Sequence, residues 1–239
     1  MKTEKFKVDG YSIREVTTAV HEAGHAVAVL RVSQMAILDS KGERVTEIVL
    51  RGSENQQREG GHCRPNGLLG YLDDIVLDLA GHQAERACGF PRDCFSPNFG
   101  VGSHGYRDKD YQMAVESARG FFYSEWAVKE IPLLSEGEQG RLLRQSYRMP
   151  KTRKDRLWHL QFNLATDLRK RHRVSLRKLR PILDHCVRRT RQLVRRPENL
   201  QLIKAIAVAL LQAPKNSKGD RVLTGKQISK LALARGETK

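Results

Sequence analysis

Two histidines four residues apart, His21 and His25, lie within the segment of clearest helical periodicity in this sequence. Before them, Ser12 and Glu15 have the spacing of a capping box, which marks the start of a helix. Apolar residues then recur at helical intervals: Ile13, Val16, Val20, Val27 and Leu30. We therefore predict a helix at about 12–33. Small residues surround the histidines, so another backbone can come close to this part of the helix: Ala23, Gly24 and Ala26.

The segment His21-Glu22-Ala23-Gly24-His25 is an H-E-x-x-H pattern. Residues four apart share one helical face, so both imidazoles can bind a single metal ion. Glu22 lies about 100° round the helix from His21, outside the ligand set but near a metal-bound water. There it can act as a general base while Zn²⁺ activates the water for attack on a peptide carbonyl. So short a pattern also arises by chance, and the competing interpretation is a helix with no metal.

A hydrolytic zinc site usually has three protein ligands and a water. The third protein ligand must therefore come from elsewhere in the chain. Composition and spacing leave five candidates open: His82, Glu85, His104, Asp108 and Asp110.

The segment HEAGHAVAVL resembles the zinc-binding helix of the FtsH-type ATP-dependent zinc metalloproteases. Downstream, LAGHQAER at 79–86 resembles that family's L-G-G-R-x-A-E helix, and GSHGYRDKDYQMA at 102–114 resembles its T-G-A-x-x-D-L-x-x-A element. In the family, the Asp of the latter element is the third zinc ligand, with an Ala four residues later. Asp110 has Ala114 at that spacing, so the resemblance implies Asp110 as the third ligand, with Asp108 in reserve.

The resemblance extends to 210–231, LLQAPKNSKGDRVLTGKQISKL, which is similar to the family's closing segment. It implies a zincin-like helical metallopeptidase domain of the FtsH peptidase type, acting on protein or peptide substrates. One departure is His82, which stands where the family has Arg. Glu85 is expected to orient a ligand histidine or to satisfy a helix contact.

The sequence contains no G-x-x-x-x-G-K-[ST] motif and no apolar stretch long enough for a membrane span. We therefore expect a metalloendopeptidase without its own ATPase or membrane helices. It would cut flexible segments unaided or work with a separate ATPase unfoldase. The resemblance also leaves assembly into a homo-oligomer open.

The fold class that we predict is mainly α with a small β element. Helices are expected at about 12–33, 67–88, 108–128, 156–171, 176–195, 198–212 and 225–234. A strand is expected at 44–51, a second one near 60–63, an ordered loop at 90–107 and a connection at 132–155. The strand at 45–50 is a candidate sheet edge for binding an extended peptide, or an ordinary packed strand. We divide the chain into a zinc-binding peptidase core, 1–130, and a basic helical region, 131–239, that completes the fold.

Positive charge is concentrated in the last part of the chain. Residues 1–150 have 19 Lys+Arg and 21 Asp+Glu, whereas residues 151–239 have 24 and 6. The excess in 151–196 favours contact with nucleic acid or another polyanion, or else forms a solvated helix face. The basic region also suggests an alternative to the peptidase. In this alternative the chain is a catalytically retired, peptidase-like adaptor whose basic helices bind nucleic acid or an acidic partner.

The four cysteines, Cys63, Cys88, Cys94 and Cys186, form no C-x-x-C pair, so neither a zinc ribbon nor a thioredoxin-type site is expected. The N-terminal segment lacks the apolar core of a secretory signal. We expect a cytoplasmic protein with free thiols.

Overall fold

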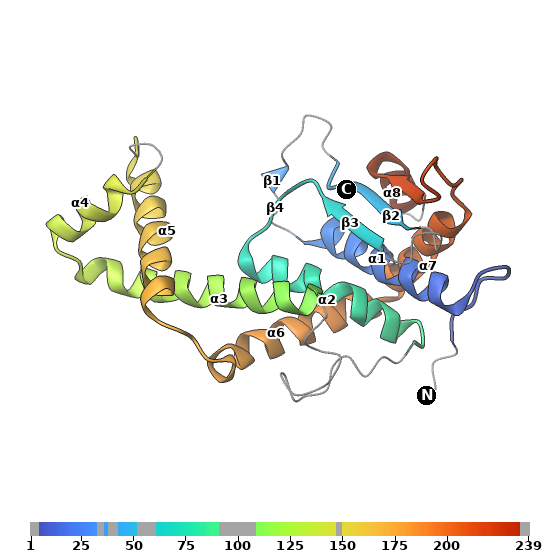
Figure 1. Ribbon diagram of the computed structural model, residues 1–239, viewed down its shortest axis with the longest axis horizontal. Coiled ribbons are helices and arrows are strands. Elements are labelled where there is room, and N and C mark those ends of the chain that lie inside the picture. Colours follow the sequence, from blue (N-terminus) through green and yellow to red (C-terminus); the bar gives the residue numbers. More distant parts are fainter. Residues whose placement is uncertain are drawn as a thin grey trace. The chain divides into compact units, whose positions relative to one another are not determined.

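A computed structural model of the chain describes residues 5–32, 36–37, 43–51, 61–90, 109–146 and 150–234. It separates into two compact units (Figure 1). The first unit contains Met1–Ala114 and Asp184–Lys239, and the second contains Val115–Leu183. The predicted division at residue 130 stays a prediction. The expected loop at 90–107 lies, apart from Phe90, outside the described residues, as do His104 and Asp108.

The mainly helical fold class is confirmed. The helices are α1 (Ile13–Arg31), α2 (Tyr71–Ala87), α3 (Lys109–Glu130), α4 (Glu136–Arg144), α5 (Arg153–Arg171), α6 (Leu176–Arg195), α7 (Pro197–Gln212) and α8 (Gly225–Leu233), with a short 3₁₀ turn at Ile131–Leu133. None of the described helices is both long and apolar enough to cross a bilayer. Of the cysteines, Cys63, Cys88 and Cys186 are free thiols, and Cys94 lies outside the described residues.

Three antiparallel strands form a small sheet in the first unit, in the order β3 (Gly61–Pro65), β2 (Val45–Leu50) and β5 (Arg221–Thr224). Ile48 of β2 lies opposite Cys63 on one side and Leu223 on the other. A separate pair joins β1 (Ala36–Ile37) to β4 (Gly67–Leu68). Of the two interpretations of 45–50, the packed strand is confirmed and the sheet edge is wrong, because β2 has a partner strand on both sides. Among the described strands, β3 and β5 lie at the edges of this sheet.

The start of α2 and the presence of α4 differ from the sequence prediction for local reasons. Asn66 does not cap α2, because its side-chain amide donates to the carbonyl of Glu43 at 2.8 Å and the next two residues pair with β1. The helix starts four residues later, with Gly70 as its N-cap. The predicted connection at 132–155 contains α4, which Ser135 and Glu138 start with a complete capping box.

Helix α1 lies between the sheet and α2 and also packs on α7 (Figure 1). Its middle is buried on nearly all sides, from Val16 to Val29. Helix α2 comes close to α1 at Gly24, where a Cβ atom would lie 2.6 Å from the Cβ of Ala84 and 2.8 Å from the carbonyl oxygen of Ala80. The small residues beside the two histidines thus accommodate a neighbouring backbone. The part of α1 that carries His21 and His25 is therefore held between the sheet and α2.

The second unit contains α4, α5 and the adjoining parts of α3 and α6. Helices α4 and α5 pack on each other. Their buried apolar side chains are Leu142, Leu143, Leu160, Leu164 and Leu168. Within this core Asn163 donates to the carbonyl of Leu142 at 2.8 Å. Across the same helix pair Arg141 forms an ion pair with Asp167 at 3.2 Å.

Candidate metal centre

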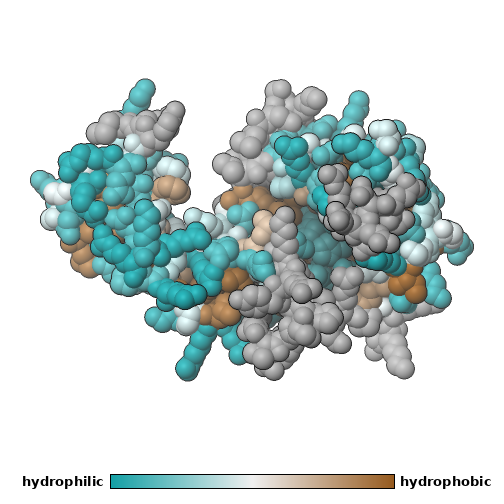
Figure 2. Space-filling view, viewed as in Figure 1, coloured by the Kyte–Doolittle hydropathy of each residue, from teal (hydrophilic) through white to brown (hydrophobic). Residues whose placement is uncertain are grey.

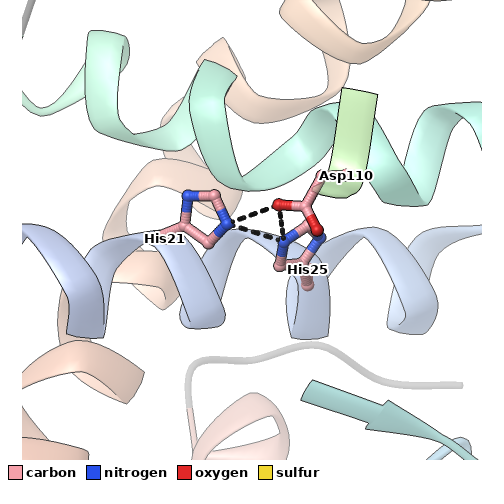
Figure 3. Close-up of side chains that lie close together, drawn as sticks. All are labelled: His21, His25 and Asp110. Atoms are coloured by element: carbon pink, nitrogen blue, oxygen red, sulfur yellow. Dashed lines mark hydrogen bonds and ion pairs between the residues drawn. The ribbon is translucent and has the colours of Figure 1, made fainter. Parts of the chain in front are cut away.

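Three potential ligand atoms converge in the first unit. His21 and His25 extend from α1, and Asp110 lies in the first turn of α3 with its carboxylate pointing toward both rings (Figure 3). The Nε2 atoms of the two histidines are 3.0 Å apart. Oδ2 of Asp110 is 2.8 Å from Nε2 of His21 and 3.4 Å from Nε2 of His25. The structure thus brings together the three residues that sequence analysis singled out as ligands, although 89 positions separate His21 from Asp110.

The opposite nitrogen of each imidazole is held by a hydrogen-bond partner on α2. Nδ1 of His25 lies 2.7 Å from the carbonyl oxygen of Leu77, which can only accept, so this nitrogen carries the hydrogen. Nδ1 of His21 lies 2.9 Å from Oε1 of Glu85. In the neutral tautomer of His25, Nε2 therefore presents a lone pair to the cluster. Partners of this kind fix the orientation of ligand histidines in metal sites.

The electrostatics of the cluster favour a positive charge between these atoms. Burial alone would lower the pKa of His21, but its hydrogen bonds with Asp110 and Glu85 raise it to about 10. Burial would likewise raise the pKa of Asp110, but hydrogen bonds with His21 and His25 hold it well below the usual value of 3.8. Two imidazoles and a carboxylate with converging lone pairs need a proton or a cation among them. Such a donor set can hold a metal ion.

Glu22 lies beside this cluster and does not join it. Its side chain is buried, and burial raises its pKa, although the neighbouring His25 and His21 act in the opposite direction. Gly61 of the edge strand β3 packs directly on it. A Cβ atom at Gly61 would lie 2.5 Å from Cγ of Glu22 and 2.7 Å from its Oε1. The Glu22 carboxyl is therefore located between the paired histidines and the backbone of an edge strand.

Glu85 and His82 lie on the other side of His21. The two imidazoles of His21 and His82 meet edge to face with centroids 4.9 Å apart, and Nδ1 of His82 is 3.9 Å from Oε2 of Glu85. His21, His82 and Glu85 thus form a second group with metal-ligating atoms, on the Nδ1 side of the same ring. The hydrogen bond to Nδ1 of His21 gives Glu85 the orienting position that sequence analysis expected for it.

Sequence analysis missed two backbone contributions. The carbonyl of Leu77 carries no side-chain signal, so no residue pattern could have identified it. Gly61 was recognised only as a residue near the start of a strand. Glycine is needed at this position because β3 packs directly on Glu22, and this contact is visible only in the structure.

Gly81 of α2 allows the His21 ring to occupy its position. A Cβ atom there would lie 2.6 Å from both Cε1 and Nε2 of that ring. We expect Gly81→Ala to displace His21, and for a zinc ion held by this cluster the displacement would weaken binding by about 10- to 100-fold, the range for disturbed ligand orientation. Alanine is the better helix former, so helix propensity cannot account for such a loss. Zinc titration against a competing chelator measures it.

The matched control is Gly70→Ala, because a Cβ atom at Gly70 has open space within 4 Å. This variant is expected to bind zinc as the unmodified chain does. Equal affinities in both variants would show that Gly81 does not set the position of His21.

No protein-family model matches this chain, and comparison with curated proteins finds no relative.

Proposed function

We propose that this protein is a zinc metalloendopeptidase of the FtsH peptidase type, with His21, His25 and Asp110 as zinc ligands and Glu22 as general base. The observation that carries the proposal is the convergence of two Nε2 atoms and one carboxylate oxygen within 2.8–3.4 Å of one another. Zinc bonds of about 2.0–2.2 Å in a tetrahedron separate neighbouring ligand atoms by roughly 3.3–3.6 Å. Small side-chain rotations would open the cluster to that size.

The groups around the ligands support the same proposal. Each histidine has its second nitrogen tied to an acceptor, as ligand histidines generally do. Three protein ligands leave a fourth position for water or substrate, which is the arrangement of hydrolytic sites rather than of structural ones. Zinc bound there would lower the pKa of a water and polarise a substrate carbonyl.

Glu22 would move the proton in this reaction. As a carboxylate it accepts a proton from the attacking water, and as a carboxylic acid it returns that proton to the leaving amine. Burial raises the pKa of Glu22, so its protonated form is easier to reach than that of an exposed glutamate. A group that must both take and return a proton is most effective when its pKa lies near the operating pH.

The edge strand β3 offers a place for the substrate backbone. Among the described strands β3 pairs only with β2, and its first residue packs on Glu22. An extended peptide that adds to β3 by backbone hydrogen bonds would pass close to the general base. This role was predicted for 45–50, but β2 is paired on both sides. An added strand must be unfolded, so the substrates we propose are flexible polypeptides or chains delivered by a separate unfoldase.

Cleavage of casein, which has little fixed structure, tests the proposal. The purified chain should cleave casein, chelation of its metal should abolish cleavage, and one equivalent of zinc should restore it. Gel electrophoresis of the products measures all three. Bound zinc without turnover of casein or of other unstructured chains would contradict peptidase activity and favour the adaptor. Cleavage that persists in apo protein would contradict the metal mechanism.

A further inference from the structure

The N-terminal half of α5 in the second unit exposes three large apolar side chains, two of which, Trp158 and Phe162, share one face of the helix. Leu157, Trp158 and Phe162 are 49%, 57% and 52% exposed. The face of this helix opposite Trp158 and Phe162 is buried: His159, Leu160, Asn163, Leu164, Asp167 and Leu168. The rings of Trp158 and Phe162 stack almost parallel, with centroids 5.4 Å apart and planes inclined by 9°. We call Leu157, Trp158 and Phe162 the aromatic stripe. Stacking holds the rings of Trp158 and Phe162 in one arrangement on the surface.

Basic residues flank the aromatic stripe along the helix. With 3.6 residues per turn, Lys154 and Arg169 lie within roughly 40° of Trp158 around the axis, one beyond each end of the stripe. They are about 22 Å apart along the helix at 1.5 Å per residue. Both are exposed, and Arg169 also reaches Oε2 of Glu116 at 2.8 Å. The stripe therefore has cationic ends and an apolar middle.

The whole second unit is cationic. Its residues 115–183 include 16 Lys+Arg and 7 Asp+Glu. The two acids of α5 are engaged within this unit, since Asp167 pairs with Arg141 and Asp155 accepts from the backbone amide of Lys151 at 3.0 Å. On the face that Figure 2 shows, the surface over α4 and α5 is mainly hydrophilic, with separate hydrophobic patches. The net positive charge of the second unit favours an anionic partner. The exposed apolar side chains of α5 favour a partner that also offers a hydrocarbon layer.

A lipid surface fits the aromatic stripe better than single-stranded nucleic acid does. Trp158 and Phe162 cover one face of each other, which leaves no slot between them for a base. Leu157 has no π-face on which a base could stack. At a membrane interface, in contrast, Trp, Phe and Leu all enter the boundary between head groups and acyl chains, while flanking Lys and Arg reach lipid phosphates.

We propose that α5 binds the surface of an anionic membrane, with the aromatic stripe inserted at the head-group level and Lys154 and Arg169 on phosphates. The buried face of α5 keeps its packing on α4, so binding needs no unfolding of the second unit. The contact is peripheral, since no described helix can span a bilayer. It depends on no residue of the candidate metal centre and stands apart from the proposed peptidase activity.

Tryptophan fluorescence tests the insertion directly. The chain has two tryptophans, so in Trp126→Phe the emission comes from Trp158 alone. We expect a blue shift with phosphatidylcholine vesicles that contain phosphatidylserine, and quenching when the acyl chains are brominated. Both effects should disappear with phosphatidylcholine alone and weaken as salt rises. No sedimentation with anionic vesicles at low salt, or sedimentation without a shift of Trp158, would overturn the proposal.

Variants separate the aromatic stripe from general charge. Trp158→Ser with Phe162→Ser should weaken vesicle sedimentation at least about tenfold, because most of the inserted apolar area is lost. Lys154→Ala should weaken it by about fivefold. The matched control Leu233→Ser removes a residue that is 60% exposed on the first unit and should change nothing. A shift of Trp158 emission by oligothymidylate and not by vesicles would assign the surface to nucleic acid and overturn the proposal.

Discussion

Replacing Glu22 with glutamine is expected to leave zinc bound and to lower the rate of casein cleavage by about 10²- to 10⁴-fold, the usual contribution of a general base. Glutamine has nearly the shape of glutamate, so it can occupy the buried space between the histidines and Gly61. It cannot accept a proton from the attacking water. Zinc content by atomic absorption and initial rates of casein cleavage measure the two effects separately.

The matched control for this variant is Glu198→Gln, which makes the same chemical change at an exposed position of α7. It should retain full activity. A Glu22→Gln protein that still cleaves casein at the original rate would contradict the proposed role of this residue. Loss of zinc together with activity would place Glu22 among the groups that hold the metal.

Replacing His21 with alanine should abolish both zinc binding and cleavage. This imidazole contributes Nε2 to the ligand cluster and is the link between Asp110 and Glu85. Loss of one of three protein ligands should weaken zinc binding by more than the roughly 10- to 100-fold that follows loss of an outer partner. Calorimetric titration with zinc measures the affinity, and circular dichroism checks that the variant is folded.

Three further substitutions guard against a trivial loss of folding. Asp110→Asn keeps the size of the side chain and should also lose tight zinc binding, whereas Asp108→Asn should retain it if Asp110 is the ligand. His185→Ala removes an exposed histidine of α6 and should behave as the unmodified chain. Zinc affinity that survives both His21→Ala and Asp110→Asn in folded protein would show that the metal, if bound, lies elsewhere.

The features that the sequence predicted well are those that local chemistry determines. The start of α1 follows from the capping box of Ser12 and Glu15, which the structure contains in full. The strand at 44–51 follows from β-branched residues between polar segments, and β2 covers six of these positions. The start of α4 also follows from a local signal, the capping box of Ser135 and Glu138. The sequence analysis did not predict this helix, although the signal is present in the sequence.

The features that the sequence could not provide depend on contacts between distant segments. The central position of β2 results from pairing with β5, which lies far along the chain. Residue spacing left five candidates for the third ligand, one of which was Asp110. Asp110 was chosen among them only because of the motif resemblance. Its approach to His21 depends on where α3 begins in space. The acceptor for His25 is a backbone carbonyl, for which sequence has no marker.

Zinc analysis of the purified, folded chain, combined with X-ray absorption at the zinc edge, tests the central claim most directly. We expect one zinc per chain, with two imidazole nitrogens and carboxylate and water oxygens at about 2.0–2.2 Å. The zinc content should fall to background when His21 or His25 is replaced. A folded protein that takes up no zinc, or a zinc environment that these substitutions leave unchanged, would contradict the account.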